Sequence, residues 1–157
     1  MESWEAYLAD IMARTGTRWA TLTPIRRTVL ELLFRHPRGL KAYDLLALVR
    51  AERDNATPPT VYRALDFLMA QGFAHKIGRN SLFVACRHAS HQWPSLFLVC
   101  PRCRAVTDLQ DAALMQTLAA TLEAAGFLLD GPEVEISAVC PACGTAKERA
   151  ENSGRAP

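Results

Sequence analysis

The chain lacks both an export signal and a membrane-spanning run. Its start, MESWEAYLAD, is acidic and polar, whereas a secretory signal has a basic start and an apolar core. No run approaches the roughly 18 apolar residues of a membrane helix. The most apolar helical stretch, residues 113–129, is interrupted by Gln116, Thr117, Thr121 and Glu123. We therefore expect a cytoplasmic protein that does not enter a membrane.

The chain also lacks a strong net charge, since the total is only +2. The charge is unevenly distributed, however. Residues 1–90 carry 13 Lys and Arg against 8 Asp and Glu, whereas residues 91–157 carry 5 against 8. A basic first half and an acidic second half indicate two modules, the first suited to a polyanion. The alternative is that arginine only covers solvated helix faces.

Cysteine is present, but its pattern is not that of a disulfide framework. Without an export signal the expected compartment is reducing, so metal ligation explains the five cysteines better than disulfides do. Cys100 with Cys103, and Cys140 with Cys143, form two CxxC units. Cys86 is left over and needs a separate explanation.

The first half has the apolar periodicity of short helices. Helices are predicted over residues 4–14, from 24 to about 36, over 41–53 and over 60–70, with Thr23 as a cap and Pro24 in the first turn of the second. On the last helix, Arg63 and Phe67 lie nearer the outer face. The predicted inward positions are Trp4, Leu8 and Ile11, then Ile25, Val29, Leu32 and Leu33, then Leu45, Leu46, Leu48 and Val49, then Val61, Leu65 and Leu68.

Two strand-like runs follow, over residues 73–77 and 81–86, joined by the basic turn Gly78-Arg79-Asn80. Three helices and a hairpin in this order predict a winged helix-turn-helix, whose last helix enters the DNA major groove while the wing touches the backbone. A helical bundle that binds only other proteins is the alternative. The exposed Arg63 and the basic wing tip favour DNA.

The second half predicts a small α/β unit. Strands are expected over residues 96–99, 105–109 and 134–139, with a helix over 111–125 that carries an apolar stripe. The stripe consists of Leu114, Met115, Leu118 and Leu122. A unit of roughly 50 residues would be stabilised by pairing with a second copy and by a bound metal.

The expected fold class is therefore α+β. We expect a winged-helix DNA-binding domain at residues 1–86, a hinge at 87–93, a dimerisation and metal-binding domain at 94–144, and a disordered tail at 145–157. Homodimerisation is expected through the second domain.

The two CxxC units predict a structural zinc site. Cys100, Cys103, Cys140 and Cys143 offer four thiolates, the donor set of a closed tetrahedral zinc site. Because the units bracket the second domain, a zinc ion there would join its two ends. A redox-active pair, or simple burial of the cysteines, is the alternative.

A second set of potential ligands is drawn from both modules. His75 lies in the first wing strand and Cys86 ends the second, and Asp108 lies in the second module. His91 and His88 stand in the linker between them. Sulfur with imidazole favours zinc over iron or manganese. Taken singly, each residue also has a structural explanation as a buried or solvated side chain.

These residues resemble the ferric uptake regulator family. The resemblance rests on the run from Tyr43, on PPTVYRALDFL from Pro58, on GFAHK from Gly72, and on CPRC and CPAC. It covers roughly residues 10–143 and is greatest for the branch of zinc uptake regulators. It implies a homodimer that binds pseudo-palindromic operators when zinc is plentiful and represses zinc-uptake genes.

The resemblance also implies roles for individual residues. The four CxxC cysteines match structural zinc ligands. His75, Cys86 and Asp108 match regulatory zinc ligands, with His91 as the fourth and His88 as its possible substitute. Tyr43 and Arg63 match positions that contact DNA in the zinc regulators. Among the other expected DNA contacts, Lys76 and Arg79 on the wing are interpreted as phosphate contacts, and the set is completed by Thr60 and Tyr62.

The segment before the first CxxC differs from that of many iron-sensing relatives, which carry a dense run of His and Asp there. Here that segment is only HASHQWP, from His88. An iron, manganese or peroxide sensor on the same scaffold is the alternative within the family. An enzyme with a structural zinc ion is an alternative function outside the family, but no catalytic motif supports it and we expect no enzymatic activity. A thiol redox switch is a further alternative function.

Overall fold

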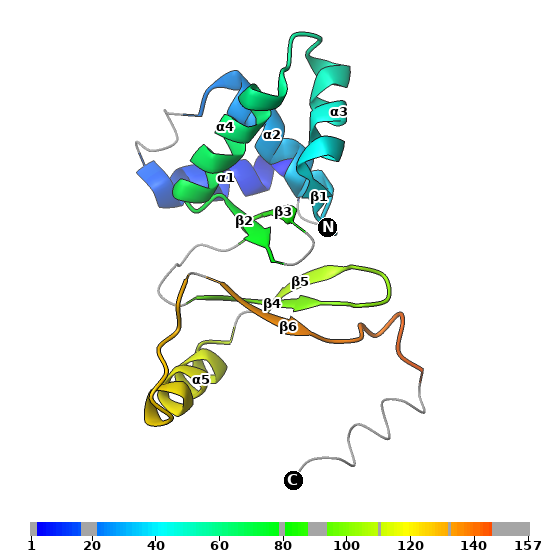
Figure 1. Cartoon of the computed structure of the whole chain (residues 1–157). Coiled ribbons are helices and arrows are strands. Elements are labelled where there is room, and N and C mark those ends of the chain that lie inside the picture. Colours follow the sequence, from blue (N-terminus) through cyan, green and yellow to red (C-terminus); the bar gives the residue numbers. More distant parts are fainter. Residues whose placement is uncertain are drawn as a thin grey trace.

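Four helices and a small sheet make up the first half of the chain (Figure 1). The computed structural model describes residues 3–16, 22–78, 81–87, 94–109, 111–131 and 133–145. The helices are α1 (Trp4–Thr15), α2 (Pro24–Arg35), α3 (Ala42–Glu52) and α4 (Pro58–Ala70). Strands β1 (Leu40–Lys41), β2 (Ala74–Ile77) and β3 (Leu82–Ala85) pair antiparallel in the order β1-β3-β2. This is the predicted winged helix-turn-helix, in which β2 and β3 form the wing.

Proline sets two of the helix starts. The α2 helix begins at Pro24, as predicted, and Thr23 is its N-cap, although the threonine side chain makes no capping hydrogen bond. The α4 helix begins at Pro58, two residues before the predicted start. Proline is tolerated in a first turn because the amide it lacks has no partner within the helix. The two wing strands were predicted over residues 73–77 and 81–86 and are slightly shorter in the structure, whereas the two-residue strand β1 was not predicted.

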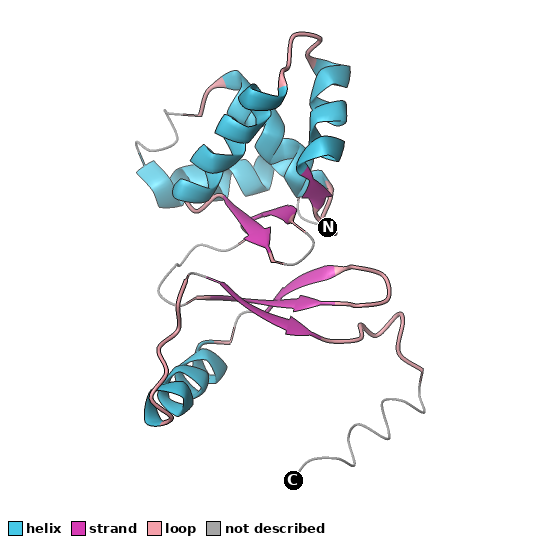
Figure 2. Ribbon diagram, viewed as in Figure 1, coloured by secondary structure: helices cyan, strands magenta, loops and turns pink. Residues whose placement is uncertain are grey.

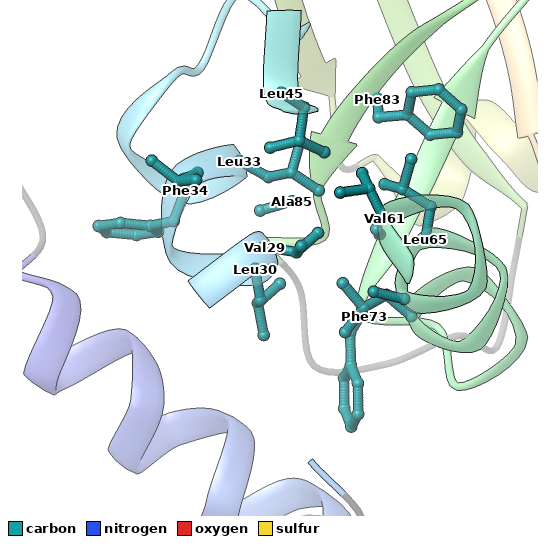
Figure 3. Close-up of a cluster of buried hydrophobic side chains, with 14 of the residues drawn as sticks. Val29, Leu30, Leu33, Phe34, Leu45, Val61, Leu65, Phe73, Phe83 and Ala85 are labelled. Carbon is teal, nitrogen blue, oxygen red and sulfur yellow. The ribbon is translucent and has the colours of Figure 1, made fainter. Parts of the chain in front are cut away.

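Helices α2, α3 and α4 pack on one another around one core, shown in Figure 3, and α2 also packs on β3, α3 on β1 and α4 on β2. The predicted inward positions of these helices are buried, except Ile25 and Leu48, which are half-buried. Two details differ from the prediction. Tyr7, and not Trp4, is the fully buried aromatic of α1. Phe67 is half-buried because the Arg26 guanidinium lies 3.5 Å above its ring.

Tyr7 ties α1 to the end of the wing. Its hydroxyl donates to the buried carbonyl of Cys86 at 2.8 Å, and its ring stacks on Phe34. We expect Tyr7→Phe to lower the free energy of unfolding by about 1–3 kcal/mol, because a buried carbonyl loses this donor. Urea unfolding followed by circular dichroism measures the change.

Tyr43→Phe is the matched control for Tyr7→Phe. Tyr43 is 80% exposed, so removing its hydroxyl group should change the free energy of unfolding by no more than about 0.5 kcal/mol. Equal effects of the two substitutions would show that the Tyr7 hydroxyl does not stabilise the wing.

A second sheet and one helix make up the rest of the described chain (Figure 2). Strands β4 (Ser95–Val99), β5 (Val106–Leu109) and β6 (Glu133–Ser137) form the order β5-β4-β6, with helix α5 (Ala112–Ala124) between β5 and β6. β4 pairs antiparallel with β5 and parallel with β6. Asp111 caps α5 by accepting from the amide of Leu114. None of the described helices is long and apolar enough to cross a membrane.

The sheet turns one face towards the wing. Strand pairing puts Phe97, Asp108 and Glu135 at matched positions on β4, β5 and β6, so their side chains share a face. Phe97 on this face packs with Ile77, Leu82 and Val84 of the wing in one buried cluster. The two halves of the protein therefore meet through side chains from the wing and from β4.

Candidate metal sites and nucleic-acid interface

The parallel pairing of β4 and β6 brings the two CxxC units together. Parallel strands end at the same edge of a sheet, and Val99 at the end of β4 lies beside Ser137 at the end of β6. Each strand is followed by a tight turn that carries one CxxC unit. As a result, the sulfurs of Cys100, Cys103, Cys140 and Cys143 all lie within 4.8 Å of one another.

The geometry of this sulfur cluster suits a tetrahedral metal ion. Cys103 Sγ lies 3.6 Å from Cys140 Sγ, close to the edge of about 3.8 Å that a tetrahedron with 2.3 Å zinc–sulfur bonds requires. A disulfide would need about 2 Å. Each CxxC lies in a turn rather than at the start of a helix, unlike the redox-active type. The cluster therefore favours metal ligation over thiol redox chemistry.

The backbone prepares one of the sulfurs as a thiolate. The amide of Cys140 donates to Cys100 Sγ at 3.4 Å. This and other backbone amides lower the pKa of Cys100 to about 6. Cys143 shows the opposite shift, because hydrogen bonds to the sulfurs of Cys103 and Cys140 raise its pKa to about 12. Because zinc is bound by the thiolate form of cysteine, the lowered pKa of Cys100 favours metal ligation at this cluster.

Arg104, directly after the first CxxC, has a left-handed backbone with φ of 60°. In that conformation its amide donates to the carbonyl of Cys100 at 2.9 Å. The amide of Gly144 makes the equivalent hydrogen bond to the carbonyl of Cys140 at 2.9 Å. The two turns thus fold back on themselves in the same way, and both direct their cysteines inward.

The wing and the sheet face each other at the predicted regulatory residues. His75 on β2 is buried, and its ring centroid lies 5.1 Å from that of Phe97. Asp108 stands opposite Phe97 on β5. Cys86 is buried directly after β3, two residues beyond Val84, which pairs with His75. Strand alternation therefore places Cys86 and His75 on the wing face that meets the sheet.

Buried polar atoms mark the same region. Nε2 of His75 and both carboxylate oxygens of Asp108 are shielded from solvent. Imidazole nitrogen, thiolate and carboxylate are a donor set that zinc accepts. Among the described residues, however, only the four cysteine sulfurs gather closely enough for a complete site. His88 and His91, the predicted fourth ligands, lie outside the described residues.

Sequence patterns missed two carboxylates that join the halves. Glu133 Oε1 lies 3.1 Å from Nδ1 of His75, and Glu135 accepts a short hydrogen bond from the backbone amide of Gly78 at the wing tip. Both are on β6, where acidic residues alternate with Val134 and Ile136. That period-two alternation was the available signal, but an acidic strand face usually indicates contact with water.

The predicted DNA contacts occupy the outer surface of the winged helix. On α4, Tyr62 and Arg63 are exposed and Thr60 is half-buried. Tyr43 at the start of α3 is exposed, and so is Lys76 on β2. Arg79 lies outside the described residues. Arg26, which was not predicted, lines a shallow pocket with Thr60 and Arg63.

Comparison with known proteins decides the family. The model of the ferric uptake regulator family matches residues 17–137. This chain belongs to that family. Within the ferric uptake regulator family, it is similar to the zinc uptake regulation protein of Escherichia coli (strain K12), with 42% identity over 143 residues. The match covers 87% of this chain and 80% of the relative.

Solved structures agree with this assignment. A crystal structure of holo XcZur has a TM-score of 0.73 and 39% identity, covering 88% of this chain and 96% of the other. A zinc uptake regulator complexed with zinc and DNA has a TM-score of 0.72 and 32% identity, covering 94% and 97%. The winged helix followed by a small sheet is thus the fold of a family of transcription regulators.

Proposed function

We propose that this protein is a zinc-responsive transcriptional repressor. In this proposal it binds pseudo-palindromic operator DNA as a homodimer when zinc is replete, and represses zinc-uptake genes. The observation that carries the proposal is the burial of His75 and Cys86 on the wing, with the His75 ring against Phe97, the β4 residue that pairs with Asp108. The similarity to zinc uptake regulators supports zinc as the signal.

Two zinc ions per subunit are proposed. Cys100, Cys103, Cys140 and Cys143 would hold a structural ion. His75, Cys86 and Asp108 would hold a regulatory ion, with His91 as the fourth ligand or His88 in its place. Zinc supplies a divalent positive charge that thiolate, imidazole and carboxylate can share.

The proposed regulatory ligands come from both halves of the chain, and this is why zinc at that site would affect DNA binding. His75 and Cys86 belong to the wing and Asp108 to the sheet, so ligation fixes the winged helix relative to the dimerisation domain. In a dimer this would set the distance between the two α4 helices. The gain in DNA affinity cannot exceed the difference in zinc affinity between two arrangements, one that fits both half-sites of the operator and one that does not. By linkage, DNA should tighten zinc binding by the same factor.

Exposed apolar side chains support the proposed homodimer. In α5 only Met115 is buried, although the helix is rich in leucine and alanine. Large apolar side chains on and around the second domain are also exposed: Leu109, Leu114, Phe127, Leu128, Ile136 and Val139. Apolar surface of this kind indicates a partner. A second copy of residues 94–144 would cover it, with residues 87–93 as the proposed hinge.

The direct test is operator binding while free zinc is titrated, with iron(II) and manganese(II) in parallel. The protein is first loaded at its structural site. We expect zinc alone to raise DNA affinity, because a thiolate ligand favours zinc over the other two. An equal response to iron or manganese would reassign the signal to the alternative sensors of this family.

Arg63 on α4 is the proposed base-reading residue, because a guanidinium can pair bidentately with guanine. We expect Arg63→Ala to lower discrimination between the operator and a single-base variant by about 1–3 kcal/mol. Fluorescence anisotropy with both duplexes measures this. Lys76→Ala is the comparison, since loss of a phosphate contact should weaken both duplexes equally and flatten the salt dependence. Unchanged discrimination in Arg63→Ala would exclude base reading by this residue.

A further inference from the structure

Two carboxylates of β6 hold the wing in different ways. Glu133 contacts the imidazole ring of His75, whereas Glu135 contacts the backbone amide of Gly78. The two residues are separated by one position on the same strand, so they share a face and carry the same charge. A Cβ added to Gly78 would lie 2.6 Å from Glu135 Oε1, so that carboxylate touches the wing backbone closely. Of these two contacts, the one made by Glu133 is the one that involves a predicted zinc ligand.

The contact with Glu133 determines which nitrogen of His75 is available to a metal. An ionised carboxylate can only accept hydrogen bonds, so Nδ1 of His75 must donate across the 3.1 Å contact. In the neutral ring, Nε2 then carries the lone pair. Nε2 is buried, and it projects from the side of the ring opposite Nδ1. The side chain of His75 is only 5% exposed, so the ring is confined in this orientation.

We propose that Glu133 is a positioning residue for the regulatory zinc site: its carboxylate fixes the Nδ1–H tautomer of His75 and directs Nε2 to the ion. This inference rests on the proposed function. A histidine ligand commonly donates its other N–H to a carboxylate, which orients the ring and makes the ligating nitrogen more basic. Glu133 comes from β6, so a second strand of the dimerisation domain contributes to the site, beside β5 with Asp108.

Zinc affinity in three variants tests this role. The chelator-competition experiment uses the full-length protein with its structural site filled, and measures the affinity for the second zinc ion. We expect Glu133→Ala to lower the affinity for this second zinc ion by roughly 10–100-fold, the usual effect of removing a carboxylate that hydrogen-bonds a histidine ligand. Glu133→Gln keeps an acceptor oxygen and should recover part of the affinity. Glu135→Ala removes the same charge two residues away without touching the ring, and should cause the smallest loss.

A second measurement separates positioning from simple joining of the two halves. In protein whose structural site is filled and whose regulatory site holds no zinc, ¹⁵N chemical shifts of the His75 ring should show a protonated Nδ1 in the wild type and in Glu135→Ala. In Glu133→Ala the shifts should indicate a mixture of tautomers. Equal zinc loss in Glu133→Ala and Glu135→Ala, with the tautomer unchanged in both, would overturn the proposal.

Failure of this proposal differs from failure of the proposed function. If Glu133→Ala binds the second zinc like the wild type while Cys86→Ser does not, the regulatory site stands and Glu133 has no role in it. If the wild-type protein itself binds only one zinc per subunit, the regulatory site is wrong and the positioning role falls with it.

Discussion

Cys140→Ser is expected to remove the structural zinc and to unfold the β4–β5–β6 sheet, while the winged helix keeps its fold. The reason lies in how little the second domain buries. Of its described residues, only Leu96, Phe97, Cys100 and Met115 belong to the buried apolar set. The winged helix, in contrast, has a continuous core drawn from α1 to α4 and the wing.

The expected effect is large compared with the stability of a small domain. Structural zinc contributes apparent free energies of about 10–16 kcal/mol in zinc-finger peptides at neutral pH, whereas whole domains are stable by only about 5–15 kcal/mol. The sulfurs join the ends of β4 and β6. Without the ion, four cysteine side chains would crowd together at that edge with nothing to join them.

Zinc content and amide hydrogen exchange measure the two parts of this prediction. Exchange should rise sharply in residues 95–109 and 133–137 and stay low in α2 and α4. Ala142→Ser is the matched control, because it adds a hydroxyl to the same exposed turn without removing a ligand. A Cys140→Ser protein that retains its zinc and its protected sheet would show that the cluster is not a structural metal site.

Local sequence signals predicted most of the fold. Apolar periodicity and proline positions located α1 to α4, and turn residues located the wing, because each of these features is encoded within a few neighbouring residues. The α5 stripe was also visible, but only Met115 on it is buried within one chain. A single sequence could not tell an inward stripe from one that faces a second subunit.

The arrangement of the residues in the two candidate metal sites was predictable to different extents. The CxxC spacing indicated zinc, but the parallel pairing of β4 with β6, which brings both units to one edge, follows from tertiary packing. His75 and Cys86 share a face because of local hairpin geometry. The contact of His75 with Phe97, the strand neighbour of Asp108, and the contact of Glu133 with His75 depend on how the wing docks on the sheet. No spacing along the chain encodes that docking.

Cys86→Ser is expected to abolish the zinc response of DNA binding while the protein stays folded. Serine is nearly isosteric with cysteine, but its hydroxyl is a poor zinc ligand at neutral pH. Cys86 is buried, and its backbone is held by its amide hydrogen bond to Phe73 and by Tyr7. The substitution therefore removes a ligand without releasing the wing from the helical core.

Two readouts should change together in Cys86→Ser. Bound zinc should fall from two ions per subunit to one, and the zinc-dependent gain in operator affinity, typically 5–150-fold for such coupling, should disappear. Ala85→Ser is the matched control, since Ala85 is a buried neighbour on β3 and gains a hydroxyl without loss of the thiol. This variant should keep both zinc ions and its zinc response.

If Cys86→Ser still binds two zinc ions and responds normally, the thiol is only a small buried side chain, and a sensor without sulfur ligation becomes the better explanation. If both variants lose the response, the wing tolerates no hydroxyl there, and the zinc count then decides whether Cys86 is a ligand.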